Sequence, residues 1–201
     1  MNATIDYYFA PQSPWTYFGH ERFTAIAKAA SAKVNVRAVD YGQIFPISGG
    51  LPLPKRAPQR QAYRLVELAR FRDALNLPTH IQPKFFPVAS DDAARLITAV
   101  ELNDGVDAAM RISGAVFQAV WEHEMDIANA ATLAMLLAQC GLAANRLELS
   151  RGAAVQDKFQ ANTQAAIAAN VFGAPSYVVN GEIFWGQDRL EFLQNRLMQA
   201  L

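Results

Sequence analysis

The stretch Ser13-Pro14-Trp15-Thr16 decides the fold, because it joins two segments with different periodicities. Before it, residues 4–9 alternate in the manner of a strand, and after it residues 17–30 form an apolar-rich segment typical of a helix. A serine at the N-cap followed by proline is a common way to begin a helix, and the exposed N–H groups there attract negative charge. The chain is therefore predicted to turn from strand to helix at a corner that would stabilise a thiolate.

Thioredoxin-like oxidoreductases carry a Cys-x-x-Cys pair at the same kind of corner. In this chain both cysteine places hold hydroxyl residues, Ser13 and Thr16. The corner resembles that of a redox fold without redox cysteines, and a disulfide oxidase is excluded because these two residues cannot form a disulfide. The single cysteine, Cys140, excludes an internal disulfide and a zinc cluster, and it predicts a cytoplasmic location.

The composition is that of a soluble globular protein. The 201 residues include 52% hydrophobic residues, enough to bury a core, and no apolar run approaches the ~20 residues that cross a bilayer. The 18 basic and 18 acidic residues balance, which argues against nucleic-acid or membrane partners. The N-terminus lacks the pattern of a signal peptide, and the three histidines lack metal-ligand spacing, so we expect no export and no metal site.

Strand and helix signals alternate at both ends of the chain. Residues 34–39 alternate like a second strand, so the first forty residues favour a parallel strand pair joined by a right-handed crossover. Residues 42–58 are rich in Gly and Pro and predict a functional loop without regular structure. Near the other end, residues 176–185 predict a hairpin around Asn180-Gly181, and a last amphipathic helix is expected over 187–201.

Helical periodicity dominates the middle of the chain, and we interpret this part as an all-helical lobe inserted into an α/β domain. The sequence therefore predicts a thioredoxin-like sheet domain built from residues 1–58 and 170–201, with a helical insertion over residues 59–169, as a single integrated unit. The expected helices of the insertion cover residues 59–76, 91–103, 106–123, 130–140, 144–150 and 152–169.

Several motifs together resemble the DsbA-like branch of the thioredoxin superfamily and, within it, the group of 2-hydroxychromene-2-carboxylate isomerases and kappa-class glutathione transferases. They are residues 13–18 near the start, 60–72 in the middle, and 171–175 with 185–189 near the end. The similarity covers essentially the whole chain. It implies a DsbA-like α/β fold, glutathione as cofactor and, because members are often dimers, a homodimer.

The resemblance also implies a glutathione site. Ser13 would donate a hydrogen bond to the sulfur of glutathione, and Ala174, ahead of a cis Pro175, would pair with its backbone. The γ-glutamyl end would lie at the segment that matches the family's Trp-Gly-Asn-Asp-Arg, where glutamine replaces the asparagine. This segment comprises Trp185, Gly186, Gln187, Asp188 and Arg189.

The substrate side of the family pattern is only partly present. The lysine of the isomerases aligns with Phe45, and the following Asn-Arg pair falls near Pro54-Lys55-Arg56, so Lys55 or Arg56 is the candidate for clamping a carboxylate. The active-site aromatic of the isomerases aligns with Phe85 or Phe86. Trp15, beside Ser13, completes the candidate substrate residues.

Three functions stay open at this point. The resemblance favours a glutathione-dependent isomerase of aromatic catabolism, which acts on an aromatic or enone-type conjugated carboxylate by addition and elimination of the thiolate. A kappa-type transferase would use the same site but consume glutathione. A non-catalytic thioredoxin-like module would bind a peptide or partner at Ala174-Pro175 without binding glutathione.

Overall fold

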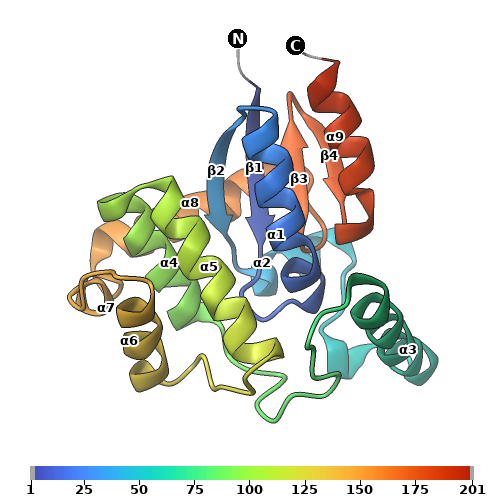
Figure 1. Cartoon of the computed structure of the whole chain (residues 1–201), viewed down its shortest axis with the longest axis horizontal. Coiled ribbons are helices and arrows are strands. Elements are labelled where there is room, and N and C mark those ends of the chain that lie inside the picture. The colour runs from blue at the N-terminus through green and yellow to red at the C-terminus, as the bar shows by residue number, and fades with distance from the viewer. Residues whose placement is uncertain (1–2, 200–201) are drawn as a thin grey trace.

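The computed structural model describes residues 3–199 and contains a mixed sheet of four strands in the order β2-β1-β3-β4 (Figure 1). β1 is parallel to β2 and antiparallel to β3, and β3 is antiparallel to β4. The predicted strand-helix-strand unit and the C-terminal hairpin are thereby confirmed. The strands are β1 (Thr4–Phe9), β2 (Lys33–Ala38), β3 (Ser176–Val179) and β4 (Glu182–Trp185).

The alternation of β1 sends its side chains into two apolar clusters. Tyr7 and Phe9 join the larger cluster with α1 (Pro14–Ala29) and α5 (Val106–Trp121), while Tyr8 joins a smaller one on the opposite face. Figure 1 shows α1 and α9 crossing one face of the sheet while α8 runs behind the other. The sheet is therefore covered by helices on both faces, and the core lies on the α1 side.

The remaining helices follow the predicted periodicity closely. The last predicted helix instead begins as a 3-10 turn, and its predicted residues 200 and 201 lie outside the described residues. The elements are α3 (Pro58–Leu75), α4 (Asp91–Asp104), α6 (Ala130–Gln139), α7 (Arg146–Leu149), α8 (Ala153–Ala168), η2 (Gln187–Arg189) and α9 (Leu190–Met198).

The hairpin turn follows from its two central residues. Asn180 and Gly181 have φ angles of 52° and 83°, and the turn type that suits the strand twist needs positive φ at both positions. Asparagine and glycine adopt that conformation more readily than other residues. The register of β3 and β4 is therefore fixed by the Asn-Gly pair that predicted it.

The predicted loop over residues 42–58 is wrong, because this segment contains α2 (Tyr41–Ser48) and a 3-10 turn, η1 (Leu53–Lys55). Asp40 caps α2 by accepting a hydrogen bond from the Gly42 amide at 2.7 Å. Tyr41 and Ile44 are buried in the smaller apolar cluster. This burial outweighs the helix hydrogen bond that Pro46 cannot make.

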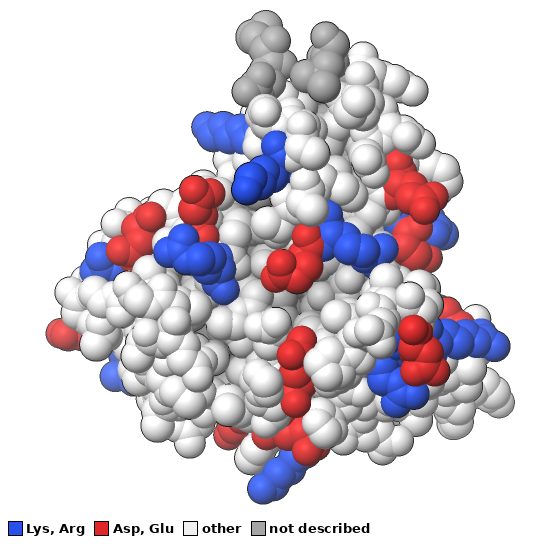
Figure 2. All heavy atoms as spheres, viewed as in Figure 1, with Lys and Arg blue, Asp and Glu red and all other residues white. Residues whose placement is uncertain are grey.

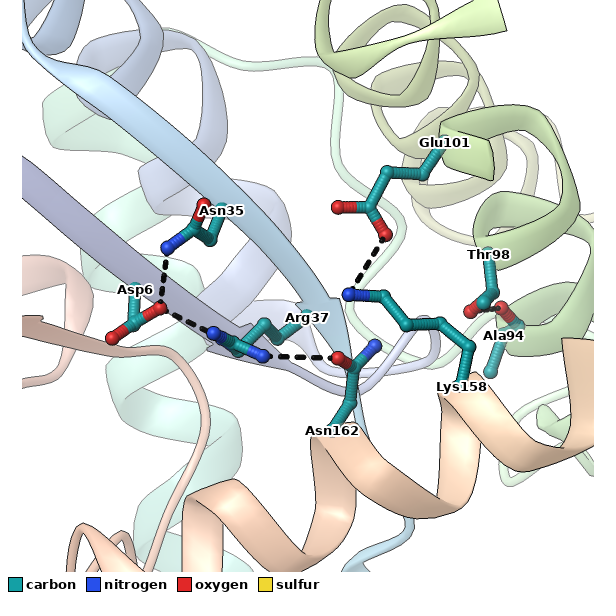
Figure 3. A network of polar contacts seen from close by, with 8 residues as sticks. All are labelled: Asp6, Asn35, Arg37, Ala94, Thr98, Glu101, Lys158 and Asn162. Carbon is teal, nitrogen blue, oxygen red and sulfur yellow. Dashed lines mark hydrogen bonds and ion pairs between the residues drawn. The ribbon is translucent and has the colours of Figure 1, made fainter. Parts of the chain in front are cut away.

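Polar contacts join the helical lobe (residues 59–169) to the sheet, as Figure 3 shows. Arg37 of β2 donates to Asp6 of β1 at 2.7 Å and to Asn162 of α8 at 3.1 Å. One turn earlier on α8, Lys158 Nζ lies 4.0 Å from Glu101 Oε2 of α4, and burial raises the pKa of this carboxyl. The lobe is therefore linked to the sheet through α8 by charged groups as well as by apolar packing.

The surface carries both signs of charge in close alternation. Figure 2 shows acidic and basic side chains interspersed on the face that carries α1 and α5. None of the helices in the described part of the chain combines the length and the apolarity needed to cross a bilayer. Cys140 lies at the C-terminal end of α6, where it is partly buried and away from the start of α1.

Candidate functional site

The corner between β1 and α1 (residues 10–16, the Ser13 corner) has the predicted helix start. Ser13 is the N-cap of α1, and its Oγ accepts a hydrogen bond from the Thr16 amide at 3.3 Å. The first turn of α1 has no acidic residue of its own to offset the partial positive charge of the helix start. Because Oγ is already an acceptor, the hydroxyl hydrogen of the half-buried Ser13 remains available to donate to a ligand.

The second hydroxyl of the corner is not exposed. Thr16 is fully buried, and its Oγ1 has no hydrogen-bond partner among the described residues. Gln12 Oε1, from the same corner, is also buried without a partner. Of the two residues that replace the cysteine pair, only Ser13 can therefore meet a ligand directly.

The segment before β3 lies beside this corner. Tyr8 pairs with Ser176, and continuing this antiparallel register brings Ala10 level with Ala174. The Ala174–Pro175 peptide bond is cis, as the resemblance implied. The carbonyl of Pro175 accepts a hydrogen bond from the Gly186 amide at 2.9 Å, so the residues after β4 adjoin the same place.

Trp185 and Phe172 form an exposed aromatic pair at the edge of this segment. Their ring centroids are 4.8 Å apart, and about half of each side chain is exposed. The Trp185 ring lies so close over Gly173 that a Cβ at Gly173 would clash with its Nε1. A glycine is therefore required at 173 for this position of the Trp185 ring.

The residues after Trp185 divide into buried and exposed ones. Gln187 is 2% exposed, and Arg22 of α1 donates to its backbone oxygen at 3.1 Å and to its side-chain oxygen. The Gln187 side chain thus holds η2 against α1, and a binding role would fall to its backbone. Asp188 is half exposed and pairs with Arg189 at 2.8 Å, so its carboxylate can reach a ligand. Gly186, with φ of 101°, makes the turn from the end of β4 into η2.

On the substrate side, Trp15 contacts α3. Its ring lies 6.0 Å from Phe71 of α3 and 6.1 Å from Phe18 of α1. Phe45 lies in α2 rather than in a loop, with its ring 5.3 Å from Tyr41. Trp15 is thus held at the start of α1 by α3, while Phe45 packs at the smaller apolar cluster that also contains Ala10.

The remaining candidate substrate residues lie in the segments that precede α3 and α4. Lys55 is exposed, and the half-buried Arg56 donates from Nε to the carbonyl of Leu51 at 2.8 Å. Phe85 is exposed, with Lys84 Nζ 5.1 Å from its ring centre. The alternative aromatic, Phe86, packs inward instead.

A residue that the sequence interpretation missed is Arg64 of α3. It is 9% exposed, and its guanidinium lies over the rings of Phe86, at 4.8 Å, and Trp121, at 5.8 Å. Arg60 and Arg64 are four residues apart and share one face of α3, and this spacing is visible in the sequence.

Two hollows in the described part of the chain lie away from Ser13. A cavity of about 130 Å³ lies between α1, α5 and the end of α3, and is lined by His20 and Phe117 among others. An open groove of about 640 Å³ runs along β4 and α9 and borders Trp185. The chemistry of the Ser13 corner, rather than the size of a hollow, identifies the candidate site.

Comparisons with known proteins find relatives of similar sequence and similar fold. A curated relative from Sphingobium xenophagum, named 2-hydroxychromene-2-carboxylate isomerase, is 26% identical over 98% of this chain and 100% of its own length. A solved structure of a 2-hydroxychromene-2-carboxylate isomerase has a TM-score of 0.79 at 22% identity, over 98% of this chain and 95% of that one. The cytosolic disulfide reductase DsbM from Pseudomonas aeruginosa, solved with GSH, has a TM-score of 0.68 at 18% identity. That comparison covers 97% of this chain and 99% of DsbM.

One protein family also matches almost the whole chain. The DSBA-like thioredoxin domain family matches residues 4–198, nearly all of the described chain. The mixed sheet, the helix that starts at Ser13 and the cis Pro175 all lie within the matched range. The chain belongs to the DsbA-like thioredoxin domain family.

Proposed function

We propose that this protein is a glutathione-dependent isomerase of the 2-hydroxychromene-2-carboxylate isomerase type. The observation that carries the proposal is the hydroxyl of Ser13, which has a hydrogen to donate at the N-terminus of α1, a helix whose first turn has no acidic residue to repel a thiolate. The curated relative that carries this isomerase name aligns over nearly the whole chain.

The residues around the Ser13 corner fit glutathione in three places. Ser13 and the first amides of α1 suit a thiolate. Continuing the pairing of β1 with β3 brings Ala174 level with Ala10 of the corner, and its backbone suits the peptide backbone of glutathione. The half-exposed carboxylate of Asp188 suits the ammonium of the γ-glutamyl group.

Glutathione held by Ser13 and the first amides of α1 would supply a thiolate for reversible addition to a conjugated double bond, and so for cis–trans isomerisation of the substrate. Ser13 donates a hydrogen bond that keeps the sulfur deprotonated. Trp15 and Phe45 give apolar walls that exclude water from the substrate. A basic residue ahead of or on α3 would neutralise the substrate carboxylate, with Lys55 and Arg56 as the candidates named from the sequence.

The experiment is a cis–trans isomerisation assay on 2-hydroxychromene-2-carboxylate with and without glutathione. We expect turnover that requires glutathione and leaves its concentration unchanged. Turnover that is independent of glutathione would reject the proposal. Consumption of glutathione with an aryl halide, without isomerisation, would indicate a kappa-type transferase instead.

A thermal-shift measurement addresses the non-catalytic alternative. Saturating glutathione at ~100 times its Kd adds about 2.7 kcal/mol to the free energy of unfolding of a true binder. The absence of any shift would favour a thioredoxin-like module that binds a different partner at Ala174-Pro175.

A further inference from the structure

Arg64 is a buried cation without a counter-charge. No described residue accepts a hydrogen bond from its guanidinium or pairs with it, and its Nη2 atom is sealed from solvent. Burial, and then the charge of Arg56, lower the pKa of Arg64 to about 10, so it is still charged at neutral pH. A buried donor left without an acceptor is unfavourable, and a ligand acceptor would relieve it.

The guanidinium of Arg64 lies against two aromatic rings. Its central carbon is 4.8 Å from the ring centre of Phe86 and 5.8 Å from that of Trp121, as in cation–π contacts. The N–H groups of a guanidinium lie in its plane and match the two oxygens of a carboxylate. The rings therefore pack against Arg64 without neutralising its charge.

The surrounding charges also favour an anion. Arg60 lies one turn before Arg64 on α3, and Arg56, just ahead of the helix, is close enough for its charge to act on Arg64. No carboxylate of the described chain forms an ion pair with any of the three. The acidic residues of α3 are engaged elsewhere: Glu67 pairs with Arg70 at 2.6 Å, and Asp73 pairs with Arg72 at 2.8 Å. These three arginines (the arginine row) form a positive face.

Helix packing locates Arg64 at the same end of the sheet as Ser13. On α5, Phe117 lies 5.4 Å from Phe9, at the end of β1, and Glu122 accepts a hydrogen bond from Tyr17, in the second turn of α1. Trp121, under Arg64, therefore lies level with the start of α1.

The α3 helix gives a second link to the same place. Phe71, which contacts Trp15, lies seven residues after Arg64, or about 10 Å along the helix axis. Arg64 is therefore on the helix that packs against Trp15, beside the Ser13 corner.

We propose that Arg64, supported by Arg60 and Arg56, binds the carboxylate of the substrate and thereby sets the specificity for an aromatic conjugated acid. This inference rests on the proposed function, because it assigns the substrate end that lies opposite the thiolate. It also gives the missing lysine of the isomerase pattern, at Phe45, a functional replacement on a different helix.

Calorimetric titration of the whole protein with cinnamate and with the neutral cinnamamide tests the assignment without turnover. We expect the wild type to bind cinnamate at least about tenfold more tightly, the worth of one charged hydrogen bond. Arg64→Met keeps the stem over the rings and should abolish the preference while leaving cinnamamide unchanged. Arg64→Lys, which keeps the positive charge, should retain part of the preference for cinnamate. Arg70→Met, on the exposed face of α3, is the matched control and should keep the full preference.

Equal affinity for the two probes in the wild type, or an undiminished preference in a folded Arg64→Met, would overturn the assignment. If Arg64→Met fails to fold, two other measurements test the assignment. They are the preference of the wild type for cinnamate over cinnamamide and the quenching of Trp121 fluorescence by cinnamate. The quenching is read in a Trp15→Phe/Trp185→Phe variant, in which Trp121 is the remaining tryptophan.

Glutathione titrations separate this inference from the proposed function. Weaker glutathione binding by Arg64→Met, with no cinnamate preference in the wild type, would mean that Arg64 holds a carboxylate of glutathione and would reject the substrate assignment. Failure of the wild type to bind glutathione would reject the proposed function, while a cinnamate preference that depends on Arg64 would still establish the anion site.

Discussion

The hydroxyl of Tyr41 donates a hydrogen bond to the carbonyl oxygen of Gly173 at 2.8 Å, although 132 residues separate them in the chain. The Ser176 hydroxyl donates to the same oxygen at 2.7 Å. The first bond ties α2 to the segment that carries Ala174 and the cis Pro175. The backbone proposed to pair with glutathione is therefore positioned by a helix from the other end of the chain.

Tyr41→Phe removes one of these two donors. Because Ser176 still satisfies the oxygen, we expect the free energy of unfolding to fall by only about 1 kcal/mol, and glutathione affinity to fall several-fold as the segment loosens. Denaturant unfolding and calorimetry measure the two effects. Tyr63→Phe, at an exposed position of α3, is the control. Unchanged glutathione affinity in Tyr41→Phe would show that α2 does not position this segment.

Ser13→Ala removes both a helix cap and the proposed donor to sulfur. We expect turnover to fall at least about tenfold and the pKa of bound glutathione, read from thiolate absorbance, to rise. The cap loss should cost about 1 kcal/mol of stability. Asn129→Ala removes the N-cap of α6, whose Oδ1 accepts from the Ala131 amide at 2.8 Å, and should cost similar stability with normal turnover. Equal turnover losses in the two variants would reduce Ser13 to a structural cap.

Asp188→Asn removes the charge proposed to face the ammonium of glutathione. Since the carboxylate is half exposed, we expect a loss of affinity of about three- to tenfold, with little change in stability. Desamino-glutathione, which lacks the ammonium, should bind the variant and the wild type equally. Asp92→Asn, in the exposed pair with Arg95 on α4, is the matched control. A variant with wild-type affinity would locate the γ-glutamyl group elsewhere.

His20 is a buried histidine whose two ring nitrogens are both engaged. Nε2 lies 3.0 Å from the carbonyl of Met110 and therefore carries the hydrogen, so Nδ1 accepts from the Tyr7 hydroxyl at 3.2 Å. Burial lowers the pKa of His20 from 6.5 to about 4. The folded protein thus holds this ring neutral at pH values where the unfolded chain is already protonated.

The free energy of unfolding should consequently fall as the pH is lowered. Between about pH 6.5 and pH 4 the unfolded state binds the additional proton, and the full loss attributable to His20 is about 3 kcal/mol. Denaturant titrations at several pH values measure it. His20→Gln should have lower stability at pH 7 but a flatter pH profile, and His123→Gln, at an exposed position, should keep the wild-type slope. A slope unchanged in His20→Gln would assign the pH dependence to other groups.

The parts of the fold that were predictable depend on short, local signals. Ser13-Pro14 begins α1 and Asn180-Gly181 makes the hairpin turn, because each pair favours its conformation whatever surrounds it. The Ala174–Pro175 motif was interpretable only through the family resemblance, since few X–Pro bonds are cis.

The parts that were missed depend on tertiary contacts. Pro46 and the glycines around it indicated a broken loop, but α2 forms because Tyr41 and Ile44 are buried against the sheet. Arg64 has the local pattern of a solvated helix face, and only the packing of Phe86 and Trp121 makes it a buried cation. The contact of the Gln187 side chain with Arg22 was also missed, because Arg22 has no sequence signal.

The position of Cys140 has a practical consequence. Since it is the chain's single thiol and lies at the end of α6, remote from the Ser13 corner, maleimides and iodoacetamide have no protein sulfur to block at that corner. Inhibition by such alkylating agents would therefore measure depletion of the small-molecule thiol in the assay, and activity should return when fresh tripeptide is added.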